Sequence, residues 1–302
     1  MNASRALFVT TATTEPADNV RAWRRYIGEA EHVTFDINGP NNDIAILAAA
    51  RAFKPEVIFY TGGVSGDGLP TEATLRNLRK IAYSIMNQGD MADPPFHPVL
   101  DRYRRQECFD LYVGMDGVKS APVDHVTLTP IDLEPFSRPP RERNIHCGFA
   151  GNVVGRARWE LIRQMHNTED PRAAVLHRLG NLVQLRERET EGSYQNYASF
   201  FRRCRMIINT SLAGSGLVHH VKGRVLESAF AGCALLEMSG SPIADWFPAD
   251  TYFTYGSVEE AARVIRGTDP AEIDRMAAAF KDHALERYTP RKIFEGILKA
   301  AK

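Results

Sequence analysis

The sequence predicts an α/β protein built from two Rossmann-like, doubly wound domains in tandem. Short apolar runs alternate with stretches of helical spacing along the chain, which is typical of βαβ units and a parallel sheet. The apolar runs are nearly continuous, as expected of strands that are covered on both faces. A charged segment with four prolines, residues 130–144, interrupts this alternation once. The length of 302 residues agrees with two domains, at roughly 100–200 residues each.

In the first half, continuous apolar runs predict strands, and apolar residues at helical spacing predict helices. The expected strands are residues 6–11, 32–37, 56–61, 81–86, 110–114 and 125–129. The expected helices are residues 18–30, 43–53, 71–79 and 98–107. A glycine-rich turn, residues 62–68, follows the third strand.

The same alternation restarts after residue 144. The expected strands are residues 145–150, 181–185, 206–209, 234–237 and 252–255. The expected helices are residues 155–165, 194–203, 220–231, 258–266, 270–286 and 291–301. The second half is therefore expected to be a second doubly wound unit that ends in a helical tail.

Residues 130–144 are expected to link the domains, because prolines and charges without periodicity are typical of linkers. The expected domains are residues 1–140 and 141–288, and residues 289–302 form a helix that packs back toward the N-terminal domain. Ligands of open α/β sheets bind outside the carboxyl ends of the strands. The two domains are accordingly expected to face a central cleft.

Composition excludes several classes of function. Lys+Arg and Asp+Glu balance at 37 each, so net charge predicts neither nucleic-acid nor membrane binding. Three short arginine clusters, within residues 102–105, 138–143 and 202–205, are expected to be solvated surface. The four cysteines contain no Cys-x-x-Cys pair, so neither a zinc site nor a redox motif is expected. Without a signal-peptide pattern or an apolar run near the ~20 residues that span a bilayer, we expect a cytoplasmic protein.

Residues 209–237 contain the most informative pattern. A strand ends at Asn209, a loop with Gly214 and Gly216 follows, and a helix is expected to begin near residue 220. Four basic side chains crowd this helix start: His219, His220, Lys222 and Arg224. Glycines, basic side chains and the N–H groups of a helix start together suit a diphosphate. Glu227 shares a helix face with Arg224 and can accept hydrogen bonds from a ribose diol.

Residues 149–159 contain a second anion-binding pattern. Gly151, Asn152 and Gly155 form the turn from a strand into a helix, and Arg156 and Arg158 lie at the helix start. Arginine is unfavourable there because of the helix dipole. A bound anion would account for these two arginines, and side chains that point to solvent are the alternative.

The second half resembles the CgeB-like branch of the GT-B glycosyltransferases, the glycosyltransferase group 1 type. The shared order of motifs covers about 150 residues and includes Phe149 to Gly151, Arg156 or Arg158, Asn209, Arg224 to Glu227, Ala231–Gly232, residues 258–264, and Tyr288, Thr289 and Arg291. The first half is similar in architecture only.

The resemblance implies a glycosyltransferase of the hexosyltransferase type whose C-terminal domain binds a UDP-sugar or another nucleotide-diphosphate sugar. It implies that Arg224 faces the diphosphate and Glu227 the ribose, while the N-terminal domain binds the acceptor. Related enzymes have a second Glu eight residues before the ribose Glu, in contact with the donor sugar. His219 occupies that position here, which leaves the sugar and the stereochemical outcome open.

A metal-independent transfer is expected because the chain contains no Asp-x-Asp motif. Positive groups and helix N–H donors then stabilise the leaving diphosphate. Candidate catalytic bases are Glu15, Asp90 and Asp93, which follow expected strands of the first half. The turn at residues 62–68 matches no known phosphate-binding motif and is interpreted as a loop near the acceptor.

Other functions remain open at this stage. A sugar-nucleotide epimerase uses the same fold, and a non-catalytic binding protein is a third reading. The acceptor of a transferase is undetermined and includes glycans, cell-surface polymers, proteins and hydroxymethylated bases in DNA. The arginine clusters within residues 102–105 and 138–143 keep the DNA acceptor as an alternative, and the oligomeric state is undetermined.

Overall fold

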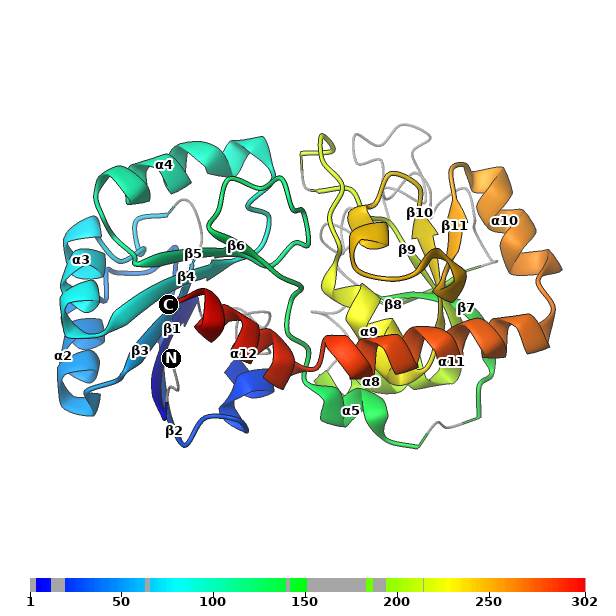
Figure 1. Cartoon of the computed structure of the whole chain (residues 1–302), viewed down its shortest axis with the longest axis horizontal. Helices are drawn as coiled ribbons and strands as arrows, with labels where there is room; N and C mark the ends of the chain where they lie inside the picture. Colours follow the sequence, from blue (N-terminus) through cyan, green and yellow to red (C-terminus); the bar gives the residue numbers. More distant parts are fainter. Residues whose placement is uncertain are drawn as a thin grey trace. The chain divides into compact units, whose positions relative to one another are not determined.

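The computed structural model describes residues 4–11, 20–62, 66–139, 142–150, 183–186, 194–213 and 215–301. The chain divides into two compact units, residues 1–132 with 290–302 and residues 133–289. The sequence placed the corresponding boundaries after residues 140 and 288. Each unit has its own parallel sheet, and Figure 1 shows the elements of both.

The first unit contains a six-stranded sheet in the order β2-β1-β3-β4-β5-β6, in which every paired strand is parallel. Its strands are β1 Arg5–Thr11, β2 Glu29–Phe35, β3 Val57–Thr61, β4 Tyr83–Gln88, β5 Leu111–Gly114 and β6 His125–Val126. Its helices are α2 Asp43–Phe53, α3 Glu72–Ile81, α4 His97–Arg105 and α12 Pro290–Ala300, with a short 3-10 helix η1 at Pro94–Phe96.

Helices cover both faces of this sheet, which explains the continuous apolar strands. Leu7 and Ile58 belong to one cluster with side chains from α2, α3 and α4. On the other face Phe294 of α12 lies 5.7 Å from the Phe59 ring, and Trp23 lies 5.1 Å from it. Figure 1 shows α2 and α3 on one side of β1 and β3, and α12 on the other. The last helix of the chain thus completes the first unit.

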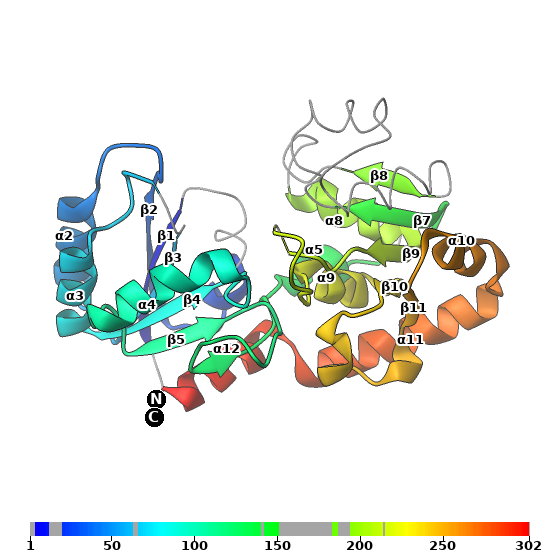
Figure 2. The same cartoon turned by 90° about the horizontal axis from the view of Figure 1, so that it is seen from above.

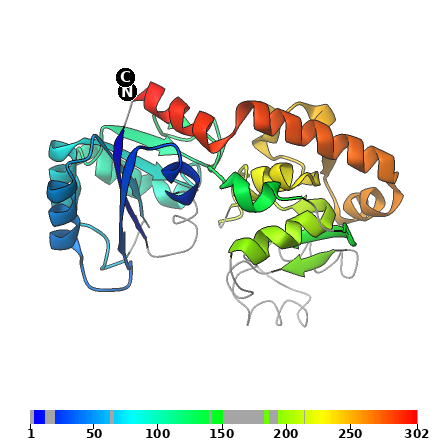
Figure 3. The same ribbon diagram turned by 90° about the horizontal axis from the view of Figure 1, so that it is seen from below.

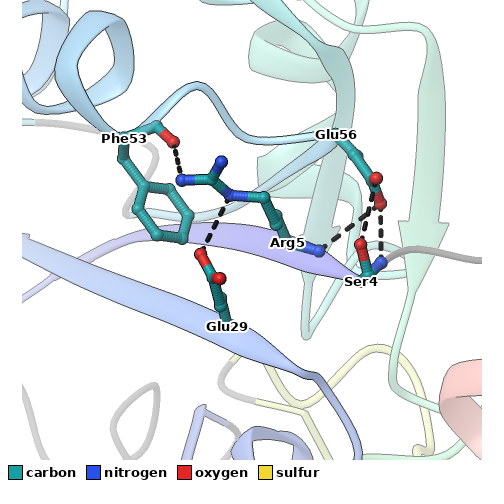
Figure 4. Close-up of polar contacts among 5 residues, drawn as sticks. All are labelled: Ser4, Arg5, Glu29, Phe53 and Glu56. Atoms are coloured by element: carbon teal, nitrogen blue, oxygen red, sulfur yellow. Dashed lines mark hydrogen bonds and ion pairs between the residues drawn. The ribbon is translucent and has the colours of Figure 1, made fainter.

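The amino ends of the strands are held by a polar cluster, drawn in Figure 4. Glu56 accepts hydrogen bonds from the backbone N–H of Ser4 at 2.6 Å and from its hydroxyl at 3.0 Å. Arg5 forms an ion pair with Glu29 at 3.1 Å and donates to the carbonyl oxygen of Phe53 at 2.5 Å. Because Glu29 is the first residue of β2 and pairs with Arg5, this cluster fixes where the sheet begins.

Replacing Glu56 with glutamine should lower stability near neutral pH and remove part of its pH dependence. Hydrogen bonds from Ser4 hold the pKa of Glu56 below its usual value. A glutamate with a lowered pKa contributes stability above its unfolded-state pKa, and that contribution is lost as pH falls through the folded-state value. Urea midpoints measured across acidic pH should therefore converge for the two proteins at low pH. Parallel curves would contradict a stabilising role of the Glu56 charge.

The second unit contains a five-stranded sheet in the order β11-β10-β9-β7-β8, again with parallel pairs only. Its strands are β7 Ile145–Ala150, β8 Gln184–Arg186, β9 Cys204–Asn209, β10 Ala234–Met238 and β11 Phe253–Tyr255. Its helices are α5 Leu133–Ser137, α8 Tyr194–Arg203, α9 Gly223–Ala231, α10 Val258–Gly267 and α11 Pro270–Arg287, with 3-10 helices η3 Pro242–Asp245 and η4 Ala249–Thr251.

This sheet is also covered on both faces. Cys147 and Phe149 of β7 belong to a cluster with residues of α10 and α11. Between them lies Gly148, where a Cβ atom would meet the Phe200 ring of α8 and the Cys204 thiol. Figure 2 shows α5, α8 and α9 on one side of the strands, and α10 and α11 on the other. Figure 3 shows from below how α11 runs along the unit. The predicted doubly wound α/β class is confirmed.

Three sequence expectations need correction. The helix expected at residues 18–30 is too long, because β2 already begins at Glu29 in register with Arg5. The expected linker contains α5, whose Phe136 is buried and packs on Phe201 at 5.5 Å between ring centres. The helix expected from residue 220 begins at Gly223 instead, because the preceding residues return from a hairpin. Along the described ranges, every helix is too short or too polar to span a bilayer.

Candidate donor site at the carboxyl ends of β7 and β9

The strand order of the second unit places a topological switch point between β7 and β9. From β7 the chain goes to β8 on one side and then to β9 on the other. In open α/β sheets, ligands bind in the crevice outside the carboxyl ends of the strands at such a point. Ala150 ends β7 and Asn209 ends β9, so the site expected from the topology lies beside these two residues.

Arg224, in the first turn of α9, reaches both strand ends. Its Nε donates to the carbonyl oxygen of Ala150, and a terminal nitrogen donates to Oδ1 of Asn209 at 2.5 Å. The guanidinium also lies over the Phe149 ring, 4.1 Å from its centre. A planar guanidinium held by stacking and hydrogen bonds keeps one orientation, which suits recognition of an anion. The structure thus joins two residues that the sequence had already assigned to one site.

Asn209 is completely buried and connects Arg224 to β10 and β11. Its Nδ2 donates to Oε2 of Glu237 at 2.7 Å, and the Tyr255 hydroxyl donates to its backbone carbonyl at 2.8 Å. Glu237 is fully buried as well, and burial raises its pKa to about 7. Sequence reasoning missed Glu237 as a site residue. The available signal was a lone carboxylate at the end of an apolar strand run.

The α9 helix begins behind a short hairpin. Leu212 and His219 form an antiparallel bridge, and Gly216 at its tip has φ of 74°, which glycine adopts without strain. The N-cap residue is Lys222, which makes no side-chain capping bond. The first turn of α9 contains no acidic residue. A helix start with basic neighbours and no acidic cap is electrostatically suited to an anionic ligand.

Two histidines stand on the returning arm of this hairpin. A 2.7 Å hydrogen bond joins the Ser211 hydroxyl to Nδ1 of His219, and Nε2 of His219 faces Gly240 after β10. Burial, followed by electrostatic interactions with His220 and Lys222, lowers the pKa of His219. His219 is therefore neutral at physiological pH. His220 is buried and accepts a hydrogen bond from Nζ of Lys222 at 3.2 Å.

Glu227 lies one turn into α9 and is almost fully buried. The Tyr197 hydroxyl of α8 donates to its Oε2 at 2.8 Å. This bond fixes the carboxylate within the layer formed by α8 and α9. The ribose contact that the resemblance implies for Glu227 stays a prediction.

The predicted catalytic carboxylates belong to the first unit. Asp90 and Asp93 form the turn after β4, with a 3.0 Å hydrogen bond from the backbone N–H of Asp93 to the carbonyl of Asp90. Asp90 is half-buried and has φ of 60°, whereas Asp93 is buried. Asp116, which the sequence did not indicate, accepts from the backbone N–H of Ala92 at 2.9 Å and shapes this turn. Six predicted site residues lie outside the described residues: Glu15, Gly151, Asn152, Arg156, Arg158 and Gly214.

The arginine clusters are largely engaged with acceptors of the protein itself. Arg102 pairs with Glu72 at 3.0 Å, and Arg104 pairs with Asp124 at 2.8 Å. In the other two clusters, Arg138 pairs with Glu134, Arg205 pairs with Asp274, and Arg143 donates to the backbone carbonyls of Cys204 and Ala231. These contacts are those of ordinary surface and packing arginines.

The described portion of the chain contains no group of three or more His, Cys, Asp or Glu residues that could hold a metal ion. All four cysteines are free thiols in buried positions. Burial raises the pKa of Cys147 to about 12 and that of Cys233 to about 11, so these thiols are inert at neutral pH.

Comparison with known proteins places the chain among sugar-transferring enzymes. The model of the glycosyl transferase-like family matches residues 142–299, slightly more than half of the chain. No curated protein sequence matches this chain.

Solved structures with the same fold are distant in sequence. Anabaena Alr3699/HepE in complex with UDP and glucose is 11% identical with a TM-score of 0.64, over 98% of each chain. An alpha-glucosyltransferase in complex with UDP-glucose and DNA containing an abasic site is 11% identical with a TM-score of 0.61, over 98% of this chain and 99% of that one. AviGT4, a glycosyltransferase involved in avilamycin A biosynthesis, is 14% identical with a TM-score of 0.54, over 98% of this chain and 96% of that one. On the strength of the family match and this shared architecture, the chain belongs to the glycosyl transferase-like family and is a glycosyltransferase with the GT-B fold.

Proposed function

We propose that the protein transfers a sugar from UDP, or from another nucleoside diphosphate, to an acceptor hydroxyl without the help of a metal ion. The observation that carries this proposal is the arrangement of Arg224, Asn209 and the start of α9 at the switch point of the second unit. Two of the solved structures named above contain UDP or UDP-glucose, which supports uracil as the base of the donor.

The diphosphate is assigned to the start of α9. Arg224, Lys222 and the N–H groups of the first helical turn are fixed positive groups there. During transfer, negative charge develops on the leaving diphosphate, and groups already oriented toward it stabilise that charge without reorganising. Metal ions perform the same role in other enzymes. The basic α9 start provides an alternative that needs none.

The remaining donor contacts follow from the same placement. We assign the ribose to Glu227, which the Tyr197 hydroxyl holds in one orientation. The donor sugar is assigned to His219, whose neutral imidazole is fixed between Ser211 and Gly240. Gly151, Asn152, Arg156 and Arg158, which follow β7 in the sequence, and Gly214 and Gly216 complete the proposed donor site.

Acceptor binding and proton removal are assigned to the first unit. In the proposed step, the acceptor oxygen forms a bond to C1 of the sugar while the bond from C1 to the diphosphate oxygen breaks. The electron pair of that bond leaves with the nucleoside diphosphate. A carboxylate takes the acceptor's hydroxyl proton, and the candidates are Glu15, Asp90 and Asp93. Of the two aspartates, Asp90 is the better exposed.

A small-molecule, glycan, polymer or protein hydroxyl is favoured over a hydroxymethylated base in DNA. DNA binding relies on arginines and lysines that neutralise phosphates. The arginine clusters that suggested DNA contain ion pairs with Glu72, Asp124 and Glu134 instead. The alpha-glucosyltransferase solved with DNA is similar in fold alone. The free buried thiols support a reducing, cytoplasmic setting.

Thermal unfolding in the presence of a panel of nucleotide sugars tests the proposal. At 100-fold excess over Kd, a bound donor should add about 2.7 kcal/mol to the stability. The gain should be the same with and without EDTA, because the proposed site uses no metal. Absence of any gain across UDP-, GDP-, ADP- and dTDP-sugars would contradict the function. A gain that EDTA abolishes would contradict the metal-independent mechanism.

A further inference from the structure

The buried hydrogen-bond network that begins at Arg224 contains a residue that the proposed function does not use. This residue is Glu237, the fourth residue of β10, which pairs in register with Asn209 of β9. Neighbouring residues in paired parallel strands project to the same face of the sheet. Glu237 and Asn209 therefore meet side by side, and Arg224 approaches Asn209 from α9.

The donor and acceptor of each hydrogen bond between Glu237, Asn209 and Arg224 follow from the chemistry of the side chains. An asparagine side chain donates only through Nδ2 and accepts only through Oδ1, and arginine can only donate. Glu237 occupies Nδ2 of Asn209 at 2.7 Å, which leaves Oδ1 toward Arg224. If Glu237 offered no acceptor, the amide could rotate and present its N–H groups to the guanidinium. Glu237 thus determines the side of Asn209 that Arg224 meets.

The second oxygen of Glu237 can be satisfied in either charge state of the carboxyl group. Within the part of the chain that the structure describes, Oε1 of Glu237 and the Ser241 hydroxyl oxygen are both buried without a hydrogen-bond partner. An ionised carboxylate could accept the Ser241 hydroxyl hydrogen at Oε1, and this interaction lowers the pKa of Glu237. A protonated carboxyl group could instead donate to the Ser241 oxygen, so the Ser241 hydroxyl can serve both charge states of the buried Glu237.

The charged and titratable neighbours of Glu237 come from each element around it. Burial raises its pKa to about 7, while Asn209, Ser241, Arg224 and Lys222 act in the opposite direction. Burial and then the charge of Glu237 raise the pKa values of the Tyr252 and Tyr255 hydroxyls. The two cations that stabilise the Glu237 anion are therefore the same ones that we assign to the diphosphate.

We infer that Glu237 is a positioning residue of the donor site, which orients Arg224 through Asn209 and takes up a proton when the donor diphosphate binds. This inference rests on the proposed function, because it requires a diphosphate at Arg224. The diphosphate adds negative charge near Glu237. It also neutralises the positive charges of Arg224 and Lys222, which otherwise stabilise the Glu237 anion. Both effects favour the neutral carboxyl group. By linkage, protonated Glu237 must in turn favour donor binding.

The test is calorimetric titration with UDP-glucose between about pH 6 and about pH 8.5, in two buffers with different ionisation enthalpies. UDP-glucose has no phosphate group that titrates in this range. Wild-type protein should take up a fraction of a proton at about pH 7.5, and its affinity should fall by up to about tenfold toward high pH, as for a pKa shift of about one unit. Burial lowers the pKa of His219, so proton uptake by its imidazole requires a lower pH than in an ordinary histidine.

Glu237→Gln is the decisive variant. The glutamine carbonyl can still accept from Asn209, and its amide N–H can donate to Ser241, so folding and low-pH affinity should be retained within about threefold. The proton uptake at about pH 7.5 and the fall in affinity should disappear. Glu237→Leu, which offers no acceptor, should lose affinity at every pH. If the leucine variant does not fold, the glutamine variant still decides the question.

Glu272→Gln is the matched control, because Glu272 is an exposed carboxylate paired with Arg275 on α11. It should behave as the wild type does. Binding of UDP-glucose without pH dependence, or an unchanged pH dependence in Glu237→Gln, would overturn the role of Glu237 and leave the proposed function intact. No binding of UDP-glucose at any pH would instead overturn both.

Discussion

Arg224→Ala should lower the affinity for UDP-glucose by about 10- to 100-fold, because a hydrogen bond to a charged group contributes roughly 1.5–3 kcal/mol. The guanidinium is the group that connects α9 to the ends of β7 and β9, through Ala150 and Asn209. Its removal takes away both the charge assigned to the diphosphate and the contact that holds the two strand ends together. The affinity is measured by calorimetric titration at neutral pH.

A structural effect of this substitution must be separated from the loss of the phosphate contact. Arg203→Ala is a suitable control, since Arg203 lies in the same unit and donates to Asn144 at the surface. Its affinity for UDP-glucose should equal that of the wild type. Thermal unfolding without nucleotide shows how much stability Arg224→Ala itself costs. If the folded Arg224→Ala protein binds UDP-glucose normally, the diphosphate is not at Arg224.

The second large effect is expected without any nucleotide. Burial raises the pKa of Glu237 from 4.5 to about 7. A glutamate with a raised folded-state pKa stabilises the protein fully below its unfolded-state pKa, and the contribution is lost as pH rises through the folded-state pKa. With about 1.4 kcal/mol for each unit of pKa, this one carboxyl group should remove about 3 kcal/mol of unfolding free energy between about pH 4.5 and about pH 7.

Comparison of the wild type with Glu237→Gln isolates that contribution. Glu56 and Glu272 have lowered pKa values, so their contributions change in the opposite sense and at lower pH. They are common to both proteins and cancel in the difference. The difference in urea-derived unfolding free energy should shift in favour of Glu237→Gln as pH rises to about 7 and then level off. A constant difference across this range would show that Glu237 is not protonated in the folded protein.

Much of the fold could be predicted from local pattern. Residues 43–53 have helical spacing and are rich in alanine, and α2 has the same bounds, Asp43–Phe53. The strands were recognisable because both faces of each sheet are covered, as Phe149 and Gly148 illustrate. Where prediction was wrong, a tertiary contact decided the structure. Phe136 converts part of the expected linker into α5 by packing on Phe201.

The start of α9 was also predicted wrongly because of a contact, in this case between residues close in sequence. Residues 219–222 have the composition of a helix start, yet the bridge between Leu212 and His219 keeps them in the returning arm of a hairpin. The basic side chains still gather at the helix start, because Lys222 is the N-cap residue and Arg224 lies in the first turn. The expected chemistry of this segment therefore does not depend on the misplaced boundary.

The candidate site was predictable in part for a similar reason. Asn209 and Arg224 stand out in the sequence because one ends a strand and the other begins a helix, and parallel strands bring such positions together. The sequence marks Glu237 only as a lone carboxylate at the end of an apolar run, without a partner. Its role depends on the register that pairs Glu237 with Asn209, and strand register is a property of the folded sheet.

A crystal structure of the protein with UDP-glucose tests the central claim most directly. The account predicts diphosphate oxygens within about 3.2 Å of a guanidinium nitrogen of Arg224 and of backbone N–H groups in the first turn of α9. A nucleotide bound elsewhere on the chain, with the start of α9 in contact only with the protein's own carboxylates, would contradict it.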